Sequence, residues 1–136
     1  MEVVNRAVLE KVPFFNGADP LFLHNLALML RSAVVPAGEP IVKEGDTTGE
    51  MYFIARGQAE AVNSSGKVLS AISEGGFFGE LSLLLGKPRS ATVRAVTQCN
   101  LFVLEQGDFE KVLRDYPEVR ASLEENARAR YAQSPK

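Results

Sequence analysis

An acid and an arginine interrupt the most apolar stretch of the chain. Residues 77–93 have the sequence FFGELSLLLGKPRSATV, in which Glu80 follows a glycine and Arg89 follows a proline. A protein core is an unfavourable place for a lone carboxylate or a lone guanidinium. Two hypotheses fit this spacing equally well. Either the two side chains form a salt bridge that ties a loop, or each holds a different part of a ligand.

A short helix is predicted between the two charges, over residues 80–85, because glycines precede it and Gly86 and Pro88 end it. The free N–H groups at the start of a helix favour an anion. Arg89 comes just after the helix, and its planar, permanently charged fork suits a phosphate. Glu80 would repel a phosphate, so hydroxyl groups of the same ligand are its better partners. A phosphate, a ribose and a flat apolar base together describe a nucleotide.

Composition limits the class of protein. The chain has 136 residues, 46% hydrophobic and 24% charged, which fits one domain with a substantial core. Its net charge of −2 argues against nucleic-acid or anionic-membrane binding as the main activity. A single cysteine, Cys99, excludes an intrachain disulfide. No apolar run reaches the ~18–20 residues of a membrane span, and we expect no membrane contact by this fragment.

Residues typical of catalysis are scarce in the sequence. The only histidine, His24, lies in an apolar segment, where we expect a structural role. One histidine and one distant cysteine do not supply a metal cluster. The chain also lacks a Ser/His/Asp order and a Walker-type phosphate loop. We therefore expect no enzyme activity, no catalytic residues and no metal site.

The pattern of apolar residues predicts three zones within one domain, residues 1–136. Residues 1–31 are predicted to be helical, with Asp19 as an N-cap and Pro20 at the first helical position. Residues 32–105 contain short β-rich runs separated by glycine and proline, which is typical of an antiparallel jelly roll. Residues 107–133 return to helix in two segments divided by Pro117. The predicted fold is α+β but mainly β: a jelly-roll barrel flanked by helices at both ends.

The sequence FGELSLLLGKPRSATV resembles the phosphate-binding cassette of cyclic nucleotide-binding domains, here residues 78–93. Their pattern is Phe-Gly-Glu, a small helix and then Arg-(Ser/Thr/Ala)-Ala-(Thr/Ser)-Val. The resemblance covers nearly the whole chain, and the flanks are most similar to the cytoplasmic C-terminal domains of cyclic nucleotide-gated and hyperpolarisation-activated channels. The segment GKPRS departs from animal channels, which usually carry two adjacent arginines. At this point the chain is nearer bacterial channels or kinase regulatory domains.

The resemblance implies a role for the residues of the cassette. Arg89 would pair with the cyclic phosphate, assisted by the amides of Ser82 and Ser90. Glu80 and the backbone of Gly79 would hold the ribose 2′-hydroxyl. A hydroxyl directly after the arginine, here Ser90, is associated in the family with acceptance of guanine. We therefore expect cGMP to bind as well as cAMP.

The resemblance also places residues outside the phosphate and ribose contacts. Val62 and Ile72 would form walls for the base, and a place in the ordinary barrel core is compatible with that role. Arg130, on the last helix, would contact the purine as part of a lid, and a plain solvated arginine is its alternative. Leu81 and Ala91 complete the set of ligand-site residues.

The implied function is that of a cyclic nucleotide sensor with no cofactor. Ligand binding would move the C-terminal lid helices and so regulate the gating of a cyclic nucleotide-modulated ion channel. The partner would be the rest of the parent channel, tetrameric when intact, and this domain would lie on the cytoplasmic side. Two alternatives are a regulatory module of a kinase or other non-channel protein, and a structural homologue that binds no nucleotide.

Overall fold

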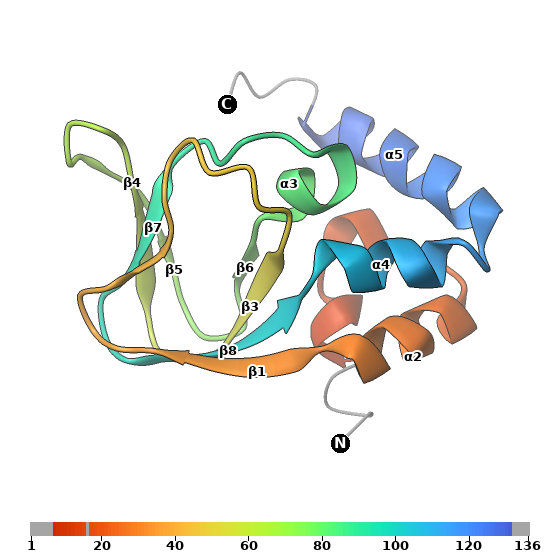
Figure 1. Cartoon of the computed structure of the whole chain (residues 1–136), viewed down its shortest axis with the longest axis horizontal. Helices are drawn as coiled ribbons and strands as arrows, with labels where there is room; N and C mark the ends of the chain where they lie inside the picture. Colours follow the sequence, from red (N-terminus) through yellow and green to blue (C-terminus); the bar gives the residue numbers. More distant parts are fainter. Residues whose placement is uncertain (1–6, 16, 132–136) are drawn as a thin grey trace. The chain divides into compact units, whose positions relative to one another are not determined.

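The computed structural model describes residues 7–15 and 17–131, apart from the side chains of Phe14, Arg130 and Tyr131 (Figure 1). The chain divides into two compact units. Residues 31–103 form one, which we call the β unit, and residues 1–30 with 104–136 form the other, which we call the helical unit. That the two units make up one domain stays a prediction.

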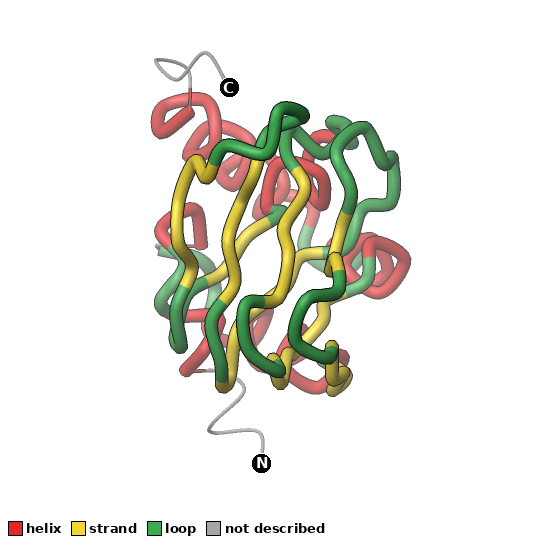
Figure 2. The backbone as a smooth tube through the Cα atoms, turned by 90° about the vertical axis from the view of Figure 1, so that its left-hand side faces the viewer, coloured by secondary structure: helices red, strands yellow, loops and turns green. Residues whose placement is uncertain are grey.

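The β unit consists of two four-stranded antiparallel sheets (Figure 2). Their strand orders are β1-β8-β3-β6 and β2-β7-β4-β5, so the first and last strands of the unit are neighbours. The strands are Arg31–Val35 (β1), Pro40–Val42 (β2), Met51–Arg56 (β3), Ala59–Val62 (β4), Val68–Ile72 (β5), Phe77–Phe78 (β6), Thr92–Ala95 (β7) and Cys99–Leu104 (β8). The predicted mainly β, antiparallel fold with flanking helices is confirmed. The strands are hydrogen-bonded into two separate sheets and not into one continuous barrel.

Alternation along β7 explains how the β unit builds its core. Val93 and Ala95 are 5% and 0% exposed, whereas Arg94 between them is exposed. Because successive strand side chains point to opposite faces, one face of β7 enters the core and the other carries a charge. On that outer face Arg94 lies directly opposite Glu60 of β4 and donates to its carboxylate at 3.2 Å.

The helical unit is assembled from segments at both ends of the sequence. It begins with a helical turn at residues 7–10 and the 3₁₀ turn η1 (Pro13–Phe15), followed by α2 (Pro20–Met29). After the β unit come α4 (Gln106–Leu113) and α5 (Pro117–Tyr131). The predicted cap of α2 is confirmed: an Asp19 carboxylate oxygen accepts from the Leu21 N–H at 2.8 Å, and Pro20 occupies the first turn.

The turn between α4 and α5 is tied to α2. Tyr116 packs edge-on against Phe22, with ring centroids 5.6 Å apart, and its hydroxyl accepts from the Asn25 amide at 3.1 Å. Edge-to-face pairs of this kind add to the energy of burial. These contacts hold the turn between α4 and α5 against α2.

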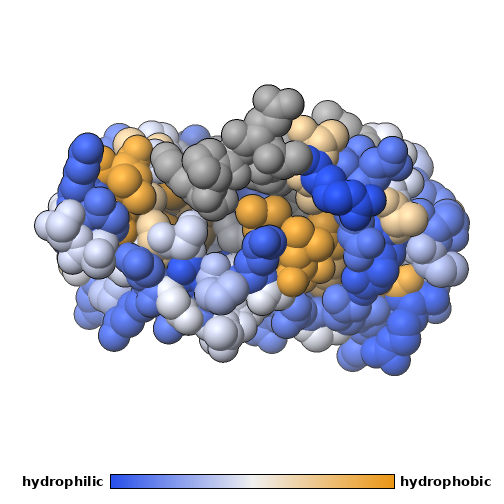
Figure 3. All heavy atoms as spheres, turned by 90° about the horizontal axis from the view of Figure 1, so that it is seen from above, coloured by the Kyte–Doolittle hydropathy of each residue, from blue (hydrophilic) through white to orange (hydrophobic). Residues whose placement is uncertain are grey.

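The face drawn in Figure 3 is mostly hydrophilic, with hydrophobic residues interspersed. In the part of the chain that the structure describes, the large apolar side chains left exposed are scattered over several elements: Leu21, Leu28, Val34, Val68, Leu69, Leu85 and Val96. None of the described helices has the length and apolar character needed to cross a bilayer.

Candidate functional site

Two backbone hydrogen bonds within the β unit fix the position of Arg89 independently of its side chain. Its N–H donates to the Asp46 carbonyl, and its own carbonyl accepts from the Gly45 N–H, both at 2.8 Å. Residues 45 and 46 belong to the loop between β2 and β3. Arg89 is therefore bonded on both sides to a segment more than forty positions earlier in the chain.

The guanidinium of Arg89 is buried and reaches the start of β3. The whole residue is 5% exposed, and its Nη2 donates to the main-chain carbonyl of Glu50 at 2.8 Å. The same nitrogen lies 3.3 Å from Oε1 of the Glu50 side chain, which completes an ion pair. The ring of Tyr52, on β3, lies 5.8 Å from the guanidinium carbon and stacks on Phe78 of β6. The hypothesis of a Glu80–Arg89 salt bridge is wrong, because the acid that pairs with Arg89 is Glu50.

Two nitrogens of this buried cation have no hydrogen-bond partner. Nε and Nη1 of Arg89 are inaccessible to solvent and bonded to nothing in the described structure. Buried polar atoms in native proteins are nearly always bonded, and an unsatisfied donor costs ~1–3 kcal/mol, more when it is charged. Both nitrogens are donors of a permanent cation, which is the chemistry that suits an anion.

The short helix α3 (Glu80–Leu85) lies in the same unit, as the sequence predicts. It begins at Gly79 and ends at Gly86, both with left-handed backbone, at φ +96° and +69°. Ser82 is 5% exposed, and its hydroxyl donates to the Lys87 carbonyl at 2.8 Å, which closes the turn after the helix. Glu80 stands at the first position of the helix.

Gly79 allows the start of α3 to approach Arg89 closely. A Cβ at this position would lie 2.6 Å from Nη1 of Arg89 and 2.8 Å from the Glu50 carbonyl oxygen. Those distances are below van der Waals contact, so glycine is required here for space as well as for its positive φ. The helix that carries Glu80 thus begins against the unpartnered side of the guanidinium.

Comparison with known proteins places these features in a family. The family model of the cyclic nucleotide-binding domain matches residues 33–116, which include α3 and Arg89. The chain belongs to the cyclic nucleotide-binding domain family. Among curated proteins, the chain is 37% identical over 126 residues to the potassium/sodium hyperpolarization-activated cyclic nucleotide-gated channel 1 of Homo sapiens. It is 36% identical to channel 2 of Mus musculus.

These relatives are much longer than the chain. The alignment covers 90% of this cyclic nucleotide-binding domain and 14% of each channel. Among solved structures, the N-terminal domain of a transcriptional regulator from Streptomyces coelicolor A3(2) has a TM-score of 0.79 and 26% identity, with 94% of each chain covered. The regulatory domain of Toxoplasma gondii PKA, solved with cAMP, has a TM-score of 0.73 and 27% identity, covering 93% of this chain and 49% of that one.

The other predicted ligand residues of this cyclic nucleotide-binding domain lie on several elements. Val62, on β4, is 6% exposed, and Ile72, on β5, packs against the core of the β unit. Ala91 and Leu81 are half-buried. Their roles toward a base stay predictions. The Arg130 backbone is in α5, and its side chain lies outside the described residues.

Ser90 differs from its neighbours in exposure. It follows the buried Arg89 directly and is itself exposed, and its hydroxyl makes no hydrogen bond to a described residue. An exposed hydroxyl directly after Arg89 in the chain is accessible to a ligand. Its proposed preference for guanine stays a prediction.

Sequence patterns missed Glu50 and Tyr52. Both belong to the segment GEMYF, whose pattern predicts the start of a buried strand. The only local sign of a contact with Arg89 is an acid placed immediately before apolar residues. Their contacts with Arg89 join positions 37 to 39 residues apart, a distance over which no local pattern operates.

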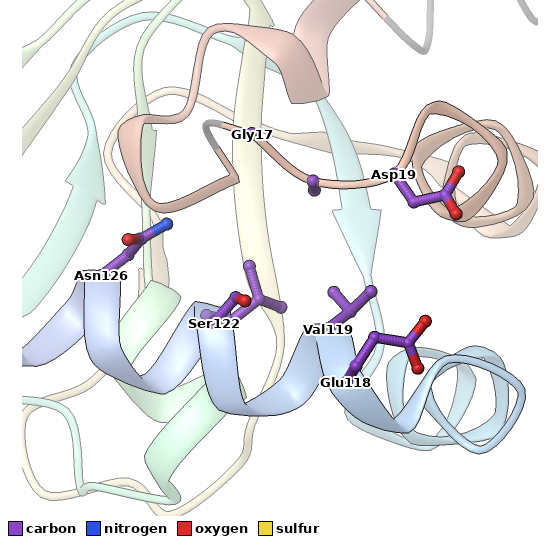
Figure 4. A pocket seen from close by; sticks show the side chains of 8 residues that line it. Gly17, Asp19, Glu118, Val119, Ser122 and Asn126 are labelled. Atoms are coloured by element: carbon purple, nitrogen blue, oxygen red, sulfur yellow. The ribbon is translucent and has the colours of Figure 1, made fainter.

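A groove of about 350 Å³ lies within the helical unit, between residues 17–19 and α5 (Figure 4). Asp19 and Glu118 lie at one end of it, Ser122 and Asn126 along α5. Both acids have structural explanations, because Asp19 caps α2 and Glu118 lies in the first turn of α5, where a negative charge is favourable. None of the predicted ligand residues whose side chains the structure describes lines this groove. In the described ranges, no three His, Cys, Asp or Glu side chains are grouped to hold a metal ion.

Proposed function

We propose that the chain binds a 3′,5′-cyclic nucleotide, cAMP or cGMP, at the site around Arg89. One observation carries the proposal: a buried guanidinium retains two unbonded nitrogens beside the start of α3. Arg89 would bind the cyclic phosphate, with the amides of Ser82 and Ser90. Glu80 would accept hydrogen bonds from the ribose hydroxyl, assisted by the Gly79 backbone.

Binding of the phosphate would satisfy donors that the protein alone leaves unpaired. A charge-assisted hydrogen bond contributes ~1.5–3 kcal/mol, enough for the ~100-fold preference between two conformations that corresponds to ~2.7 kcal/mol. We propose that this preference favours a state in which α5 closes over the base as a lid, with Arg130 on the purine. The ligand shifts the equilibrium only by its difference in affinity for the two states.

We further propose that this movement regulates a cyclic nucleotide-modulated ion channel of which the chain is the cytoplasmic ligand-binding part. The 37% sequence identity to a hyperpolarization-activated channel, which extends over 90% of the chain, supports this role. A regulatory module of a kinase is the second candidate, supported by the similarity to a PKA regulatory domain. In both roles the domain senses a ligand and performs no catalysis.

Calorimetric titration of the protein with cAMP and with cGMP tests the proposal. We expect saturable 1:1 binding of both nucleotides, and a loss of at least tenfold in affinity in Arg89→Ala. Arg94→Ala is the matched control, because Arg94 also pairs with a glutamate but lies on the outer face of the sheet. Equal affinity in wild type and Arg89→Ala would overturn the assignment.

A further inference from the structure

We propose that Glu50 makes the Arg89 site selective for phosphates that carry a single negative charge, so that a phosphodiester is accepted and a doubly charged phosphate monoester is rejected. The proposal rests on the proposed function and adds a selectivity that the phosphate contacts alone do not supply.

The protein itself places a negative charge, the Glu50 carboxylate, beside the guanidinium proposed to bind the phosphate. Oε1 of Glu50 lies 3.3 Å from Nη2, while Nε and Nη1 of the same guanidinium are unbonded. A phosphate on those two nitrogens would share one small planar cation with the Glu50 carboxylate. The pair of Arg89 and Glu50 is neutral as a unit, so Glu50 offsets part of the attraction that Arg89 exerts on the phosphate.

Burial makes that shared cation sensitive to the ligand's charge. The Arg89 side chain is 3% exposed and that of Glu50 26% exposed, so water and salt screen the interaction only in part. A monoanion adds one negative charge to a neutral pair. A dianion doubles both its attraction to Arg89 and its repulsion by Glu50, while its desolvation cost rises about fourfold, so the attraction that Glu50 has weakened compensates a dianion less well. Linear nucleoside monophosphates are dianions near neutral pH, because their second pKa is about 6.

Glu50→Gln removes the charge and leaves the geometry. The shorter contact of Nη2, at 2.8 Å, is with the main-chain carbonyl of residue 50, which every substitution retains. The glutamine side chain also keeps an amide oxygen that can accept from Nη2. Arg89 is therefore held in both proteins, and the two differ in the charge at the site.

Two ligands that differ by one charge separate this effect from ring shape. They are 5′-AMP and adenosine 5′-(methyl phosphate), which are both linear, and cAMP serves as the reference. Each is titrated directly into the wild type, Glu50→Gln and Glu60→Gln at about pH 7.5 and about 0.1 M salt. Glu60→Gln is the matched control, because Glu60 is also a partly exposed acid paired with an arginine, on the outer face of β4.

We expect wild type to bind the methyl ester at least ~5-fold more tightly than 5′-AMP, and Glu50→Gln to reduce that ratio to within ~2-fold. The gain in Glu50→Gln falls mainly on 5′-AMP, and Glu60→Gln keeps the wild-type ratio. If cAMP binds wild type but the ratio is the same in wild type and Glu50→Gln, the charge selectivity is wrong and the proposed function stands. If cAMP does not bind wild type, both fail.

Discussion

Arg120 in the helical unit and Arg89 in the β unit each pair with a glutamate, and their surroundings differ. In the helical unit, Arg120 of α5 is 36% exposed and pairs with Glu110 of α4 and with Glu124 one turn along α5. In the β unit, Arg89 is 3% exposed, pairs with Glu50 and leaves two nitrogens unbonded. Arg120 thus pairs with more acids than Arg89 does, although at its exposed position water could hydrogen-bond the guanidinium instead.

The contrast separates an exposed ion pair from a buried one that leaves donors unbonded. Exposed salt bridges contribute little, ~0–1 kcal/mol, and their loss is tolerated because water replaces the partner. A buried cation with unbonded donors lowers stability, because those donors have lost water and gained no partner. We propose that anion binding at Arg89 compensates for this cost, as the proposed function requires.

The largest effect is expected from closing the space beside Arg89. Gly79→Ala should destabilise the fold by ~2–4 kcal/mol, because a Cβ there meets Nη1 and a backbone carbonyl and the backbone is left-handed. Gly86→Ala is the matched control at the other end of α3. It also has positive φ but open space around its Cβ, and should cost ~1 kcal/mol. Chemical denaturation measures both, and equal losses would show that the approach to Arg89 does not constrain Gly79.

Truncating the two arginines should affect different properties. Arg89→Ala should weaken cAMP binding by at least tenfold, about 1.4 kcal/mol or more, with an unfolding free energy equal to or above that of wild type. Arg120→Ala should leave the cAMP affinity within ~2-fold and cost at most ~1 kcal/mol of stability. Calorimetry and urea denaturation of the two variants measure these changes. A stability loss in Arg89→Ala with unchanged binding would make Arg89 a structural residue like Arg120.

Glu80→Ala should weaken the binding of both cyclic nucleotides several-fold, because a carboxylate that accepts from a ribose hydroxyl makes a charge-assisted bond of ~1.5 kcal/mol or more. Glu74→Ala, an exposed acid that precedes the cassette, is the control and should bind as wild type does. Titration with 2′-deoxy-cAMP gives an independent check. Wild type and Glu80→Ala should bind this analogue with similar affinity, and a persistent difference would separate Glu80 from the 2′-hydroxyl.

The smallest effect is expected at Ser90. Ser90→Ala should weaken cGMP binding by ~3–10-fold and cAMP binding by less than ~2-fold, as expected for the loss of one neutral hydrogen bond. Because Ser90 is exposed, the substitution should leave the unfolding free energy within ~0.5 kcal/mol of wild type. Parallel titrations with the two nucleotides decide the point. Equal losses for both would remove Ser90 from base selection.

Local elements of the fold were predictable because their signals lie within a few residues. Asp19 and Pro20 predict the start of α2, and the glycines on either side of residues 80–85 predict the ends of α3. Such signals are local because helix caps and left-handed turns require particular residue types. The burial pattern of β7 likewise follows the alternation of side chains along its sequence. The type and position of Arg89 suggested that it binds an anion. The resemblance to the family cassette then gave most of the support for that prediction.

The sequence by itself determined the helices, the β-rich middle and the two charged residues of the cassette. Only the tertiary structure decided the order of strands in the two sheets and the partner of Arg89. Glu50 precedes Arg89 by 39 positions, and the pair exists because β3 and the segment before β7 fold into one unit. Such a contact depends on which distant segments share a core, and no local preference of either residue encodes it.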